Sequence, residues 1–370
     1  MSIVLTEESI SLVAFFAVTL ACTLSNAYHN GIKLKKEYVI SLKPTELIPP
    51  DGLFTPRLVL PCKNIVGECP IWDVHRNLLW WVDIEDRKLY SLNLHGDVEI
   101  VLLPERCGSF ALCESNTRIL LSLESGFAFY YLNDSRLVRL YSRSYKQIEG
   151  TRSNDGRCDR NGRFIVGGCN GVNANKDSWE KNLSTFSVKY NRFTGGIVIR
   201  RMSMPLVHCT NSICFSLDGT SMFHTDSPSR EIRCYDYDTC KGDIIDSNIF
   251  VEIKERKVGK IRYNPVPDGS IVDSSGNVWN AEYDGRRLAL YKPYYEGSNN
   301  SKNENRVSTK GQLISEVPMP VEKVTCATLG GPGLKWLFIT SCRGKETESG
   351  GLFVASVSVP GTPESRFCDV

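Results

Sequence analysis

One short pattern occurs six times in this chain of 370 residues and limits what it can fold into. Each copy is a short apolar segment, then a turn rich in Asp, Asn and Gly, then a second apolar segment. The clearest copies are Glu68-Cys-Pro-Ile-Trp-Asp73, Asn154-Asp-Gly-Arg-Cys-Asp159, Asn211-Ser-Ile-Cys-Phe-Ser216 and Asp268-Gly-Ser-Ile-Val-Asp273. Two weaker copies begin at Ser109 and Thr325. A repeat with a period of about 40 to 50 residues is typical of propellers and solenoids.

Each repeat has the signature of a β-hairpin followed by a third strand. The third strands are expected at Lys88–Leu92, Ala128–Leu132, Phe186–Tyr190, Ile232–Tyr237, Leu288–Tyr291 and Leu352–Ala355. One such sheet cannot bury both of its faces, whereas six can stack into a closed ring. We therefore predict an all-β, six-bladed β-propeller over residues 41–370, with Arg57–Leu60 as the outer strand of the last blade. The polar stretches Gly171–Asn182 and Glu296–Gly311 are predicted to be loops.

The residues that open the repeats are candidates for a metal site. In a propeller the first strand of each blade lines the central channel and enters from the same end, so these residues should converge. They are Glu68, Ser109, Asn154, Asn211, Asp268 and Thr325. A ring of carboxylate, amide and hydroxyl oxygens suits Ca²⁺, Mg²⁺ or Mn²⁺, and carboxylates also bind Zn²⁺.

The alternative is that these polar residues only cap hairpins, which is a common role of Asn and Asp. The turns already have residues of their own for that role: Asp73, Asp159, Asp218 and Asp273. Capping also gives no reason for Glu68. The set of six therefore favours the metal site, although any single copy fits either interpretation.

The overall composition is that of a soluble globular protein without a nucleic-acid partner. The chain has 44 Lys and Arg against 42 Asp and Glu, so no basic surface that would attract nucleic acid is expected. The five histidines have no metal-ligand spacing, and the 14 cysteines form no CxxC pair. Most of the cysteines are expected to be buried thiols.

Residues 1–40 are predicted to be a separate N-terminal segment and linker. Ile10–Leu24 is an apolar run of the length of a signal-peptide core, and Ser25 and Ala27 supply a cleavage pattern. Glu7 and Glu8 stand where a signal peptide has basic residues, so a membrane anchor is the second interpretation. The protein would then be secreted or membrane-associated, and cytoplasmic if the segment is only a buried helix.

Five ordered segments resemble the senescence marker protein 30/gluconolactonase/luciferin-regenerating enzyme family. They are GECPIWD, RSNDGRCDRNGRF, CTNSICFSLDG, PDGSIVDSSGNVW and VTCATLGG, within roughly residues 58 to 356. The resemblance implies a six-bladed propeller with one Ca²⁺ or Zn²⁺ ion, ligated by Glu68, Asn211 and Asp268. It also implies that Asn154 sits beside the metal and that Arg152 binds substrate.

The chain departs from the family pattern in two places. Ser212 follows Asn211 where the family often has Gly. The loop after Gly167 carries Asn170 to Asn173 where some sugar lactonases have an acidic residue that binds substrate. Asp177 and Glu180 lie in the same loop, and a solvated loop face is the expected role of both.

The function predicted from the sequence is the metal-dependent hydrolysis of a small lactone, of the sugar type. A divalent ion polarises a carbonyl and acidifies bound water, and Asp268 is the candidate general base. Arg152 and Asn154 would orient the substrate and stabilise negative charge on its carbonyl oxygen. No G-x-S-x-G nucleophile motif is present, so covalent serine catalysis is not supported.

A protein without enzyme activity is the main alternative, namely a calcium-binding or partner-binding propeller whose metal is structural. A propeller enzyme of the strictosidine-synthase or paraoxonase kind would need catalytic residues that the sequence does not place.

Overall fold

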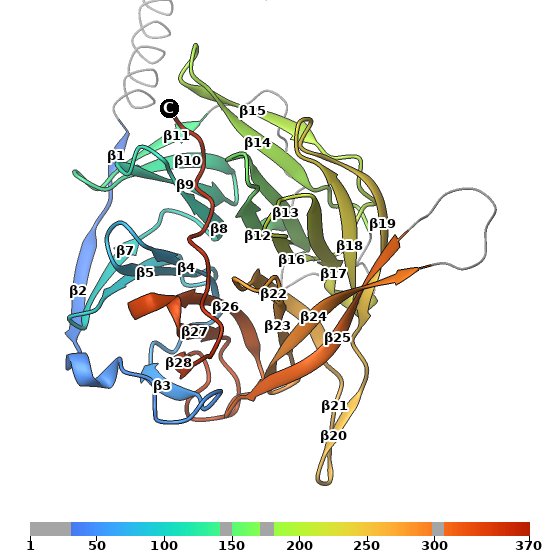
Figure 1. Ribbon diagram of the computed structural model, residues 1–370. Helices are drawn as coiled ribbons and strands as arrows, with labels where there is room; N and C mark the ends of the chain where they lie inside the picture. Colours follow the sequence, from blue (N-terminus) through green and yellow to red (C-terminus); the bar gives the residue numbers. More distant parts are fainter. Residues whose placement is uncertain (1–30, 141–149, 171–180, 298–306) are drawn as a thin grey trace, which may run out of the picture.

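Six antiparallel sheets stand in a ring around a common axis (Figure 1). The computed structural model describes residues 31–140, 150–170, 181–297 and 307–370. Strands that follow one another along the chain are neighbours within each of these six sheets, so each is an up-and-down meander that starts at the axis, and three of them gain one more outer strand from the N-terminal part of the chain. The prediction of an all-β, six-bladed β-propeller is confirmed.

The strands of each blade follow one another along the chain, from the innermost strand outwards. Blade 1 consists of β4 (Gly67–Asp73), β5 (Leu78–Asp83), β6 (Lys88–Asn93) and β7 (Asp97–Leu102). Blade 2 consists of β8 (Cys107–Leu112), β9 (Arg118–Leu123), β10 (Gly126–Tyr131) and β11 (Arg136–Leu140). Blade 3 consists of β12 (Thr151–Cys158), β13 (Phe164–Asn170), β14 (Phe186–Asn191) and β15 (Gly196–Arg201).

The second half of the ring has the same plan. Blade 4 consists of β16 (Thr210–Phe215), β17 (Ser221–Asp226), β18 (Glu231–Asp238) and β19 (Asp243–Glu252). Blade 5 consists of β22 (Val266–Val272), β23 (Val278–Tyr283), β24 (Arg287–Gly297) and β25 (Val307–Pro318). Blade 6 has β26 (Val324–Gly330), β27 (Trp336–Ser341) and β28 (Leu352–Ser356). Three short 3-10 helices lie among the described residues: Pro44–Glu46, Ser227–Ser229 and Pro332–Leu334.

The ring is closed by a strand from the beginning of the propeller sequence. β3 (Arg57–Leu60) pairs with β28 and supplies the fourth strand of blade 6. The predicted role of Arg57–Leu60 is therefore confirmed. Because this pairing joins the two ends of the propeller sequence, opening the ring requires breaking a sheet.

An N-terminal arm adds one strand to each of two blades. β1 (Ile32–Lys33) pairs with β11 in blade 2, and β2 (Lys36–Ser41) pairs with β7 in blade 1. The sequence analysis placed these residues in the linker, since the repeat pattern does not extend to them. In the structure they cover the open outer edges of β7 and β11.

The core lies between neighbouring blades and is tightest near the axis. Trp81 and Trp279 are among the largest fully buried side chains. Glycines allow the inner strands to approach closely: a Cβ on Gly108 would lie 2.2 Å from the Ser153 carbonyl oxygen of the next blade, and one on Gly269 would lie 2.3 Å from Cys326 Sγ. The inner strands β4, β8, β12, β16 and β26 are buried along their whole length.

The predicted turn residues act as turn residues. The carboxylate of Asp73 accepts from the His75 N–H at 3.0 Å, and the Asp159, Asp218 and Asp273 carboxylates accept similar bonds two residues ahead. The predicted loop Glu296–Gly311 is partly wrong, because β24 continues to Gly297 and β25 begins at Val307. That segment alternates polar and apolar residues poorly, and its strands are stabilised by pairing with each other.

The C-terminal tail crosses the end of the ring where the hairpin turns lie (Figure 1). Backbone bonds join Phe367 to Leu112 and Cys368 to Gly162, and Ser274 N–H donates to the Pro360 carbonyl. On the axis, Glu364 lies 3.4 Å from Arg157 Nη1 of β12. The tail thus covers the end of the ring opposite to the start of the inner strands.

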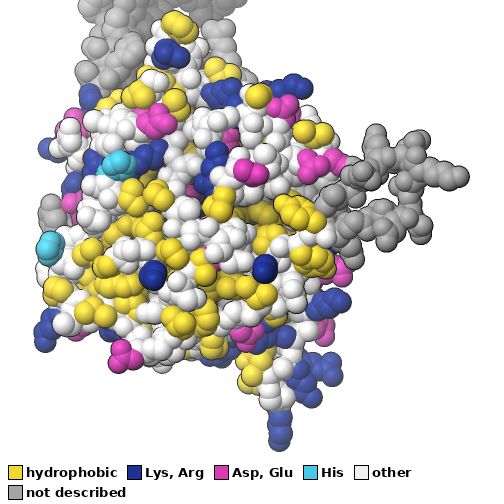
Figure 2. Space-filling model, in the orientation of Figure 1, with side chains coloured by type: hydrophobic (Ala, Val, Ile, Leu, Met, Phe, Trp, Pro, Cys, Tyr) yellow, Lys and Arg dark blue, Asp and Glu magenta, His cyan; other side chains and the backbone are white. Residues whose placement is uncertain are grey.

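A two-stranded hairpin projects from the ring between blades 4 and 5 (Figure 1). It consists of β20 (Arg256–Val258) and β21 (Ile261–Tyr263), and residues 257–262 are exposed. Basic side chains gather at its tip, while charges of both signs are scattered over the rest of this face (Figure 2).

The apolar segment Ile10–Leu24 lies outside the described residues, and so does most of the predicted loop Gly171–Asn182. Within the ranges described, no helix has the length and apolar character needed to cross a membrane.

Candidate functional site

The residues that open the repeats lie at the start of an irregularity in the inner strands or inside it. Register shifts follow at Glu68/Ile71 in β4, Ser153/Gly156 in β12, Asn211/Cys214 in β16 and Pro267/Ser270 in β22. Bulges of this kind re-aim side chains and are common beside active sites. Because the shift recurs at one level of the ring, the polar side chains of four blades come together there.

Two of the predicted ligands, Glu68 and Asp268, form a buried pair of carboxyl groups. Each is only 7% exposed, and their side chains hydrogen-bond to each other. Burial, followed by the charge of Asp155, raises the pKa of Glu68 to about 7. Burial and the neighbouring Glu68 carboxylate raise the pKa of Asp268 well above its usual range. Ionising both of two carboxyls held this close costs free energy, because the two negative charges repel each other. A cation bound between them would offset this repulsion.

The third predicted ligand, Asn211, is held in a defined orientation. Its Nδ2 donates to Ser227 Oγ at 2.8 Å, and Ser227 in turn donates to the Pro267 carbonyl at 2.8 Å. The amide oxygen Oδ1 accepts from Asn154 Nδ2 at 3.1 Å. The nitrogen is thus bound to Ser227, which links it to blade 5, whereas the oxygen faces Asn154.

The predicted substrate residues Asn154 and Arg152 contact each other and Asn211. Asn154 Nδ2 also donates to the Thr210 carbonyl at 2.8 Å, and Asn154 Oδ1 accepts a short bond from Arg152 Nη1. Arg152 Nε lies 3.3 Å from Glu85 Oε1, and among the described residues neither of these two buried atoms has a partner in hydrogen-bond geometry. Arg152 is 7% exposed, and its charge lowers the pKa of Glu68. All five predicted site residues therefore belong to one cluster.

The backbone is left-handed directly after two of the predicted ligands. Cys69, which follows Glu68, has φ of 50°, and Ser212, which follows Asn211, has φ of 59°. Non-glycine residues seldom adopt such angles, and they concentrate at functional sites. The preference for Gly after this Asn in the resembling family has its physical reason here.

Two of the six residues that open the repeats, Ser109 and Thr325, make no side-chain hydrogen bond to the cluster within the described ranges. Thr325 Oγ1 donates to the Gly67 carbonyl at 2.5 Å, so its hydroxyl is used between blades 6 and 1. Ser109 Oγ is buried and has no hydrogen-bond partner among the described residues. Asp177 and Glu180 lie outside the described residues.

The sequence analysis missed three neighbours of the cluster. Asp155, directly after Asn154, is buried, and its carboxylate accepts from the Ile213 N–H at 2.7 Å. Strict alternation along a strand would place Asn154 and Asp155 on opposite faces, but the bulge in β12 makes both part of the interior. Two cysteines, Cys169 and Cys209, also lie beside Arg152, and no spacing in the sequence indicated them.

Cys209 contacts the amides directly: its sulfur lies 3.6 Å from Asn154 Nδ2 and 4.0 Å from Asn211 Nδ2. The pKa of the Cys169 thiol is lowered to about 7, first by a hydrogen bond with Cys209 and then by the charge of Arg152, against the opposing effect of burial.

One of the five histidines, which lack metal-ligand spacing in the sequence, lies close to the cluster. His208 Nδ1 lies 3.0 Å from Asp226 Oδ2, and the same carboxylate accepts from the backbone N–H groups of His208 and Cys209. Lys181 approaches it to 3.6 Å. Asp226 therefore holds the turn that leads into Asn211.

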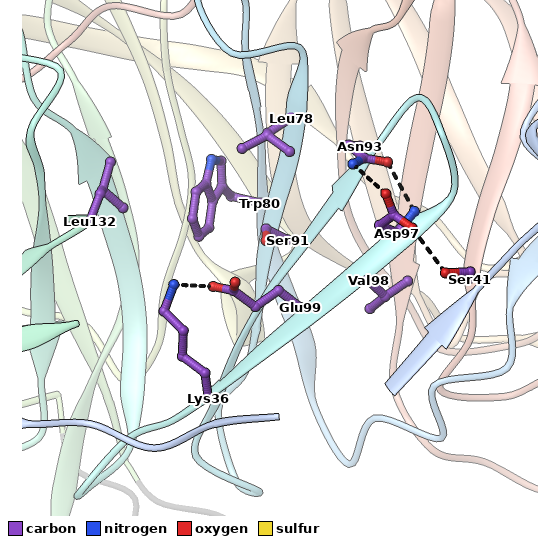
Figure 3. A pocket seen from close by; sticks show the side chains of 10 residues that line it. All are labelled: Lys36, Ser41, Leu78, Trp80, Ser91, Asn93, Asp97, Val98, Glu99 and Leu132. Carbon is purple, nitrogen blue, oxygen red and sulfur yellow. Dashed lines mark hydrogen bonds and ion pairs between the residues drawn. The ribbon is translucent and has the colours of Figure 1, made fainter. Parts of the chain in front are cut away.

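A separate pocket of ≈ 750 Å³ lies away from the cluster, beneath the N-terminal arm (Figure 3). Its charged groups already have partners: Lys36 pairs with Glu99 at 2.7 Å, and Asp97 accepts from Ser41 at 2.9 Å. Asn93 Nδ2 donates to the Asp97 carboxylate in the β6–β7 turn. The pocket contains none of the predicted site residues.

The carboxyls and amides fit a divalent cation. Within the described ranges no three His, Cys, Asp or Glu side chains converge as a ready metal site. The donors would therefore be the carboxylates of Glu68 and Asp268 and the amide oxygen of Asn211, an all-oxygen set that suits hard cations such as Ca²⁺. A cation would also offset the burial and the charge repulsion that raise the pKa of the two carboxyls.

The fold and the cluster together define a six-bladed β-propeller. Its innermost strands carry two buried carboxyls and two amides that lie close together. Residues 66–343 match the family model described as SMP-30/Gluconolactonase/LRE-like region. The chain therefore belongs to the SMP-30/gluconolactonase/LRE-like family, and the resemblance noted in the sequence is confirmed.

Two relatives match this chain over nearly their whole length. L-arabinolactonase from Azospirillum brasilense is 30% identical over 86% of this chain and 97% of its own. 6-deoxy-6-sulfogluconolactonase from Pseudomonas putida is 28% identical over 85% of this chain and 98% of its own. Among solved structures, regucalcin from Agrobacterium tumefaciens, described as a calcium-binding protein, superposes with a TM-score of 0.69 at 22% identity, covering 85% of this chain and 97% of its own.

Proposed function

We propose that this protein is a metal-dependent lactonase that hydrolyses a small sugar lactone at the cluster of Glu68, Asn154, Asn211 and Asp268. The observation that carries the proposal is the buried Glu68–Asp268 pair beside an oriented amide and a buried arginine. The similarity to two proteins named as sugar lactonases supports the choice of substrate class.

Lactone hydrolysis adds water to the ring ester carbonyl and breaks the ring C–O bond. When bound, a divalent ion would supply the Lewis acidity that polarises this carbonyl. Asp268 would accept the proton of the attacking water, because a carboxylate at the edge of the donor set can reach it. The same group can return that proton to the alkoxide that leaves, so the cycle is balanced.

Arg152 and Asn154 would orient the lactone. Arg152 is held by Asn154 through Nη1 and approaches Glu85 without a hydrogen bond, which leaves N–H groups to turn towards a substrate oxygen. A buried guanidinium in a low-dielectric site stabilises the negative charge that develops on a carbonyl oxygen.

A hydrolysis screen tests this proposal. Purified protein is assayed by pH titration against sugar, aliphatic and aromatic lactones, before and after EDTA and after return of Ca²⁺, Zn²⁺, Mg²⁺ or Mn²⁺. We expect activity on a sugar lactone that EDTA abolishes and one of these ions restores. Full activity in metal-free protein would refute the metal-dependent mechanism. Metal binding without hydrolysis of any lactone would favour the alternative, a propeller whose ion is structural.

A further inference from the structure

Two cysteines of neighbouring blades face each other beside the candidate metal site. Cys169 lies near the end of β13 in blade 3, and Cys209 precedes β16 in blade 4 by one residue. The two residues form an isolated antiparallel bridge. Both are buried, with 7% and 9% of their surface exposed.

Cys169 and Cys209 form a non-hydrogen-bonded pair, the type of antiparallel pair in which the two Cα atoms are closer together. The Asn170 N–H donates to the His208 carbonyl at 3.1 Å, so the backbone bond flanks the cysteine pair instead of joining its members. Residues opposite each other in such a non-hydrogen-bonded pair have Cα atoms about 4.5 Å apart. Disulfides span Cα separations of about 4.4 to 6.8 Å, so the backbone is already placed for a cross-link.

The side chains agree with the backbone. The two thiols are close enough for each to shift the pKa of the other, in keeping with a backbone that places the two residues opposite each other. All thirteen cysteines within the described ranges are thiols, and Cys169 and Cys209 are the pair among them that strand pairing places directly opposite each other. We propose that Cys169 and Cys209 form a disulfide bond that joins blade 3 to blade 4 at the rim of the metal site.

The reaction is an ordinary thiol–disulfide exchange with a low-molecular-weight disulfide such as oxidised glutathione. One cysteine thiolate attacks a sulfur of the small disulfide, forms a mixed disulfide with that half and releases the other half as a free small thiol. The second cysteine thiolate then attacks the protein sulfur of that mixed disulfide and releases the second. Two protein thiols lose two electrons and two protons, and one small disulfide is reduced to two thiols.

The cross-link would act on stability and on the site together. It would close a loop of about 40 residues, which restricts the unfolded chain. It would also fix the backbone at Cys209, two residues before Asn211, and draw the Cys209 sulfur towards Cys169 and away from Asn154 and Asn211, whose amides it now contacts.

The test uses the full chain equilibrated in glutathione buffers from fully reduced to fully oxidised, with free thiols then blocked by an alkylating reagent. Trypsin places Cys169 in peptide 164–176 and Cys209 in peptide 202–230, which also contains Cys214. Cys214→Ala is therefore the matched control: it is buried in the same peptide and has no thiol partner among the described residues.

We expect oxidised protein to contain the 164–176 and 202–230 peptides joined, with a Tm roughly 3 to 8 °C above that of the reduced form. Cys209→Ala and Cys169→Ala should abolish both the link and the Tm shift, whereas Cys214→Ala should retain both. The protein is also refolded from urea in the same buffers, because in the unfolded chain the two thiols are exposed and the oxidant can reach them. A link that survives in Cys209→Ala, or a pair that stays reduced even after refolding in oxidised glutathione, would overturn the proposal.

Discussion

The hydroxyl of Ser212 donates to the backbone carbonyl of Asp268 at 2.6 Å and joins the inner strands of blades 4 and 5. Asn280 Nδ2 reinforces this contact, since it lies 3.0 Å from the Asp268 carbonyl and 3.1 Å from Ser212 Oγ. The residue next to the candidate ligand Asn211 thus holds the backbone of the candidate ligand Asp268. A serine in place of glycine gains a hydrogen bond between two blades but places a non-glycine residue in a strained, left-handed backbone conformation.

Replacements of Ser212 should separate these two effects. Ser212→Ala loses the hydrogen bond and keeps a side chain at positive φ, so we expect a loss of about 1 to 2 kcal/mol in the free energy of unfolding. Ser212→Gly loses the same bond but relieves about 1 kcal/mol of backbone strain, so it should be more stable than the alanine variant. Urea unfolding measures both. A glycine variant less stable than the alanine variant would contradict the role of the strained backbone.

The buried carboxyl pair predicts a pH dependence of stability in metal-free protein. The pKa of Glu68 is about 7 in the folded chain against an ordinary value of 4.5. The unfolded chain releases this proton near pH 4.5 and the folded chain only near pH 7, so the folded form should lose about 3 kcal/mol of stability as the pH rises across this window. The raised pKa of Asp268 acts in the same direction.

Thermal melts in EDTA at pH 5 and pH 8 measure this loss, and saturating Ca²⁺ or Zn²⁺ should reverse it at pH 8. The control is Glu68→Gln, which removes the titrating group and should flatten the dependence. Wild type and Glu68→Gln with equal slopes would show that Glu68 does not titrate in this window.

The sequence was enough to predict the repeats and the third strands, and the five candidate site residues that it proposed lie in one cluster. These features follow from local patterns, such as an inner strand that ends in an Asp turn, and from a resemblance carried by short motifs. The site neighbours Asp155 and Cys169 could not be predicted in this way. Asp155 enters the interior only because a bulge breaks the alternation of β12, and Cys169 meets Cys209 only because blades 3 and 4 are adjacent in space.

The N-terminal arm was missed for a related reason. β1 and β2 do not belong to the repeat, and their strand character comes from the open edges of β11 and β7 on which they pair. A chain that starts at Gly31 should therefore be as stable as the full chain, whereas one that starts at Ser41 should melt several degrees lower. Calorimetry on both checks this. Equal melting temperatures would mean that the arm contributes no stability to the ring.

We expect the C-terminal tail to contribute strongly to the free energy of unfolding, because Asp369 pairs with Arg118 in the ring. Its carboxylate lies 2.7 Å from Arg118 Nε and accepts from Ser115 Oγ at 2.7 Å, and the Asp369 side chain is fully buried. Asp369→Asn leaves Arg118 partly unpaired and should cost about 2 kcal/mol or more. The matched control is Asp134→Asn, which breaks an exposed ion pair with Arg136 and should cost less than about 0.5 kcal/mol. Urea unfolding of the two variants compares them, and similar losses would contradict a structural role of the tail.

Asp268 is assigned two roles, metal ligand and general base, and the decisive measurement separates them. Turnover of the best lactone is compared for wild type, Asp268→Asn and Glu68→Gln while the metal is raised to saturation. Glu68→Gln should act mainly through metal affinity and regain part of its activity. Asp268→Asn keeps one oxygen donor but lacks basicity, so its turnover should stay about 10² to 10⁴ below wild type at any metal concentration. Recovery of Asp268→Asn to near wild-type turnover would show that Asp268 is only a ligand and that another group takes the proton.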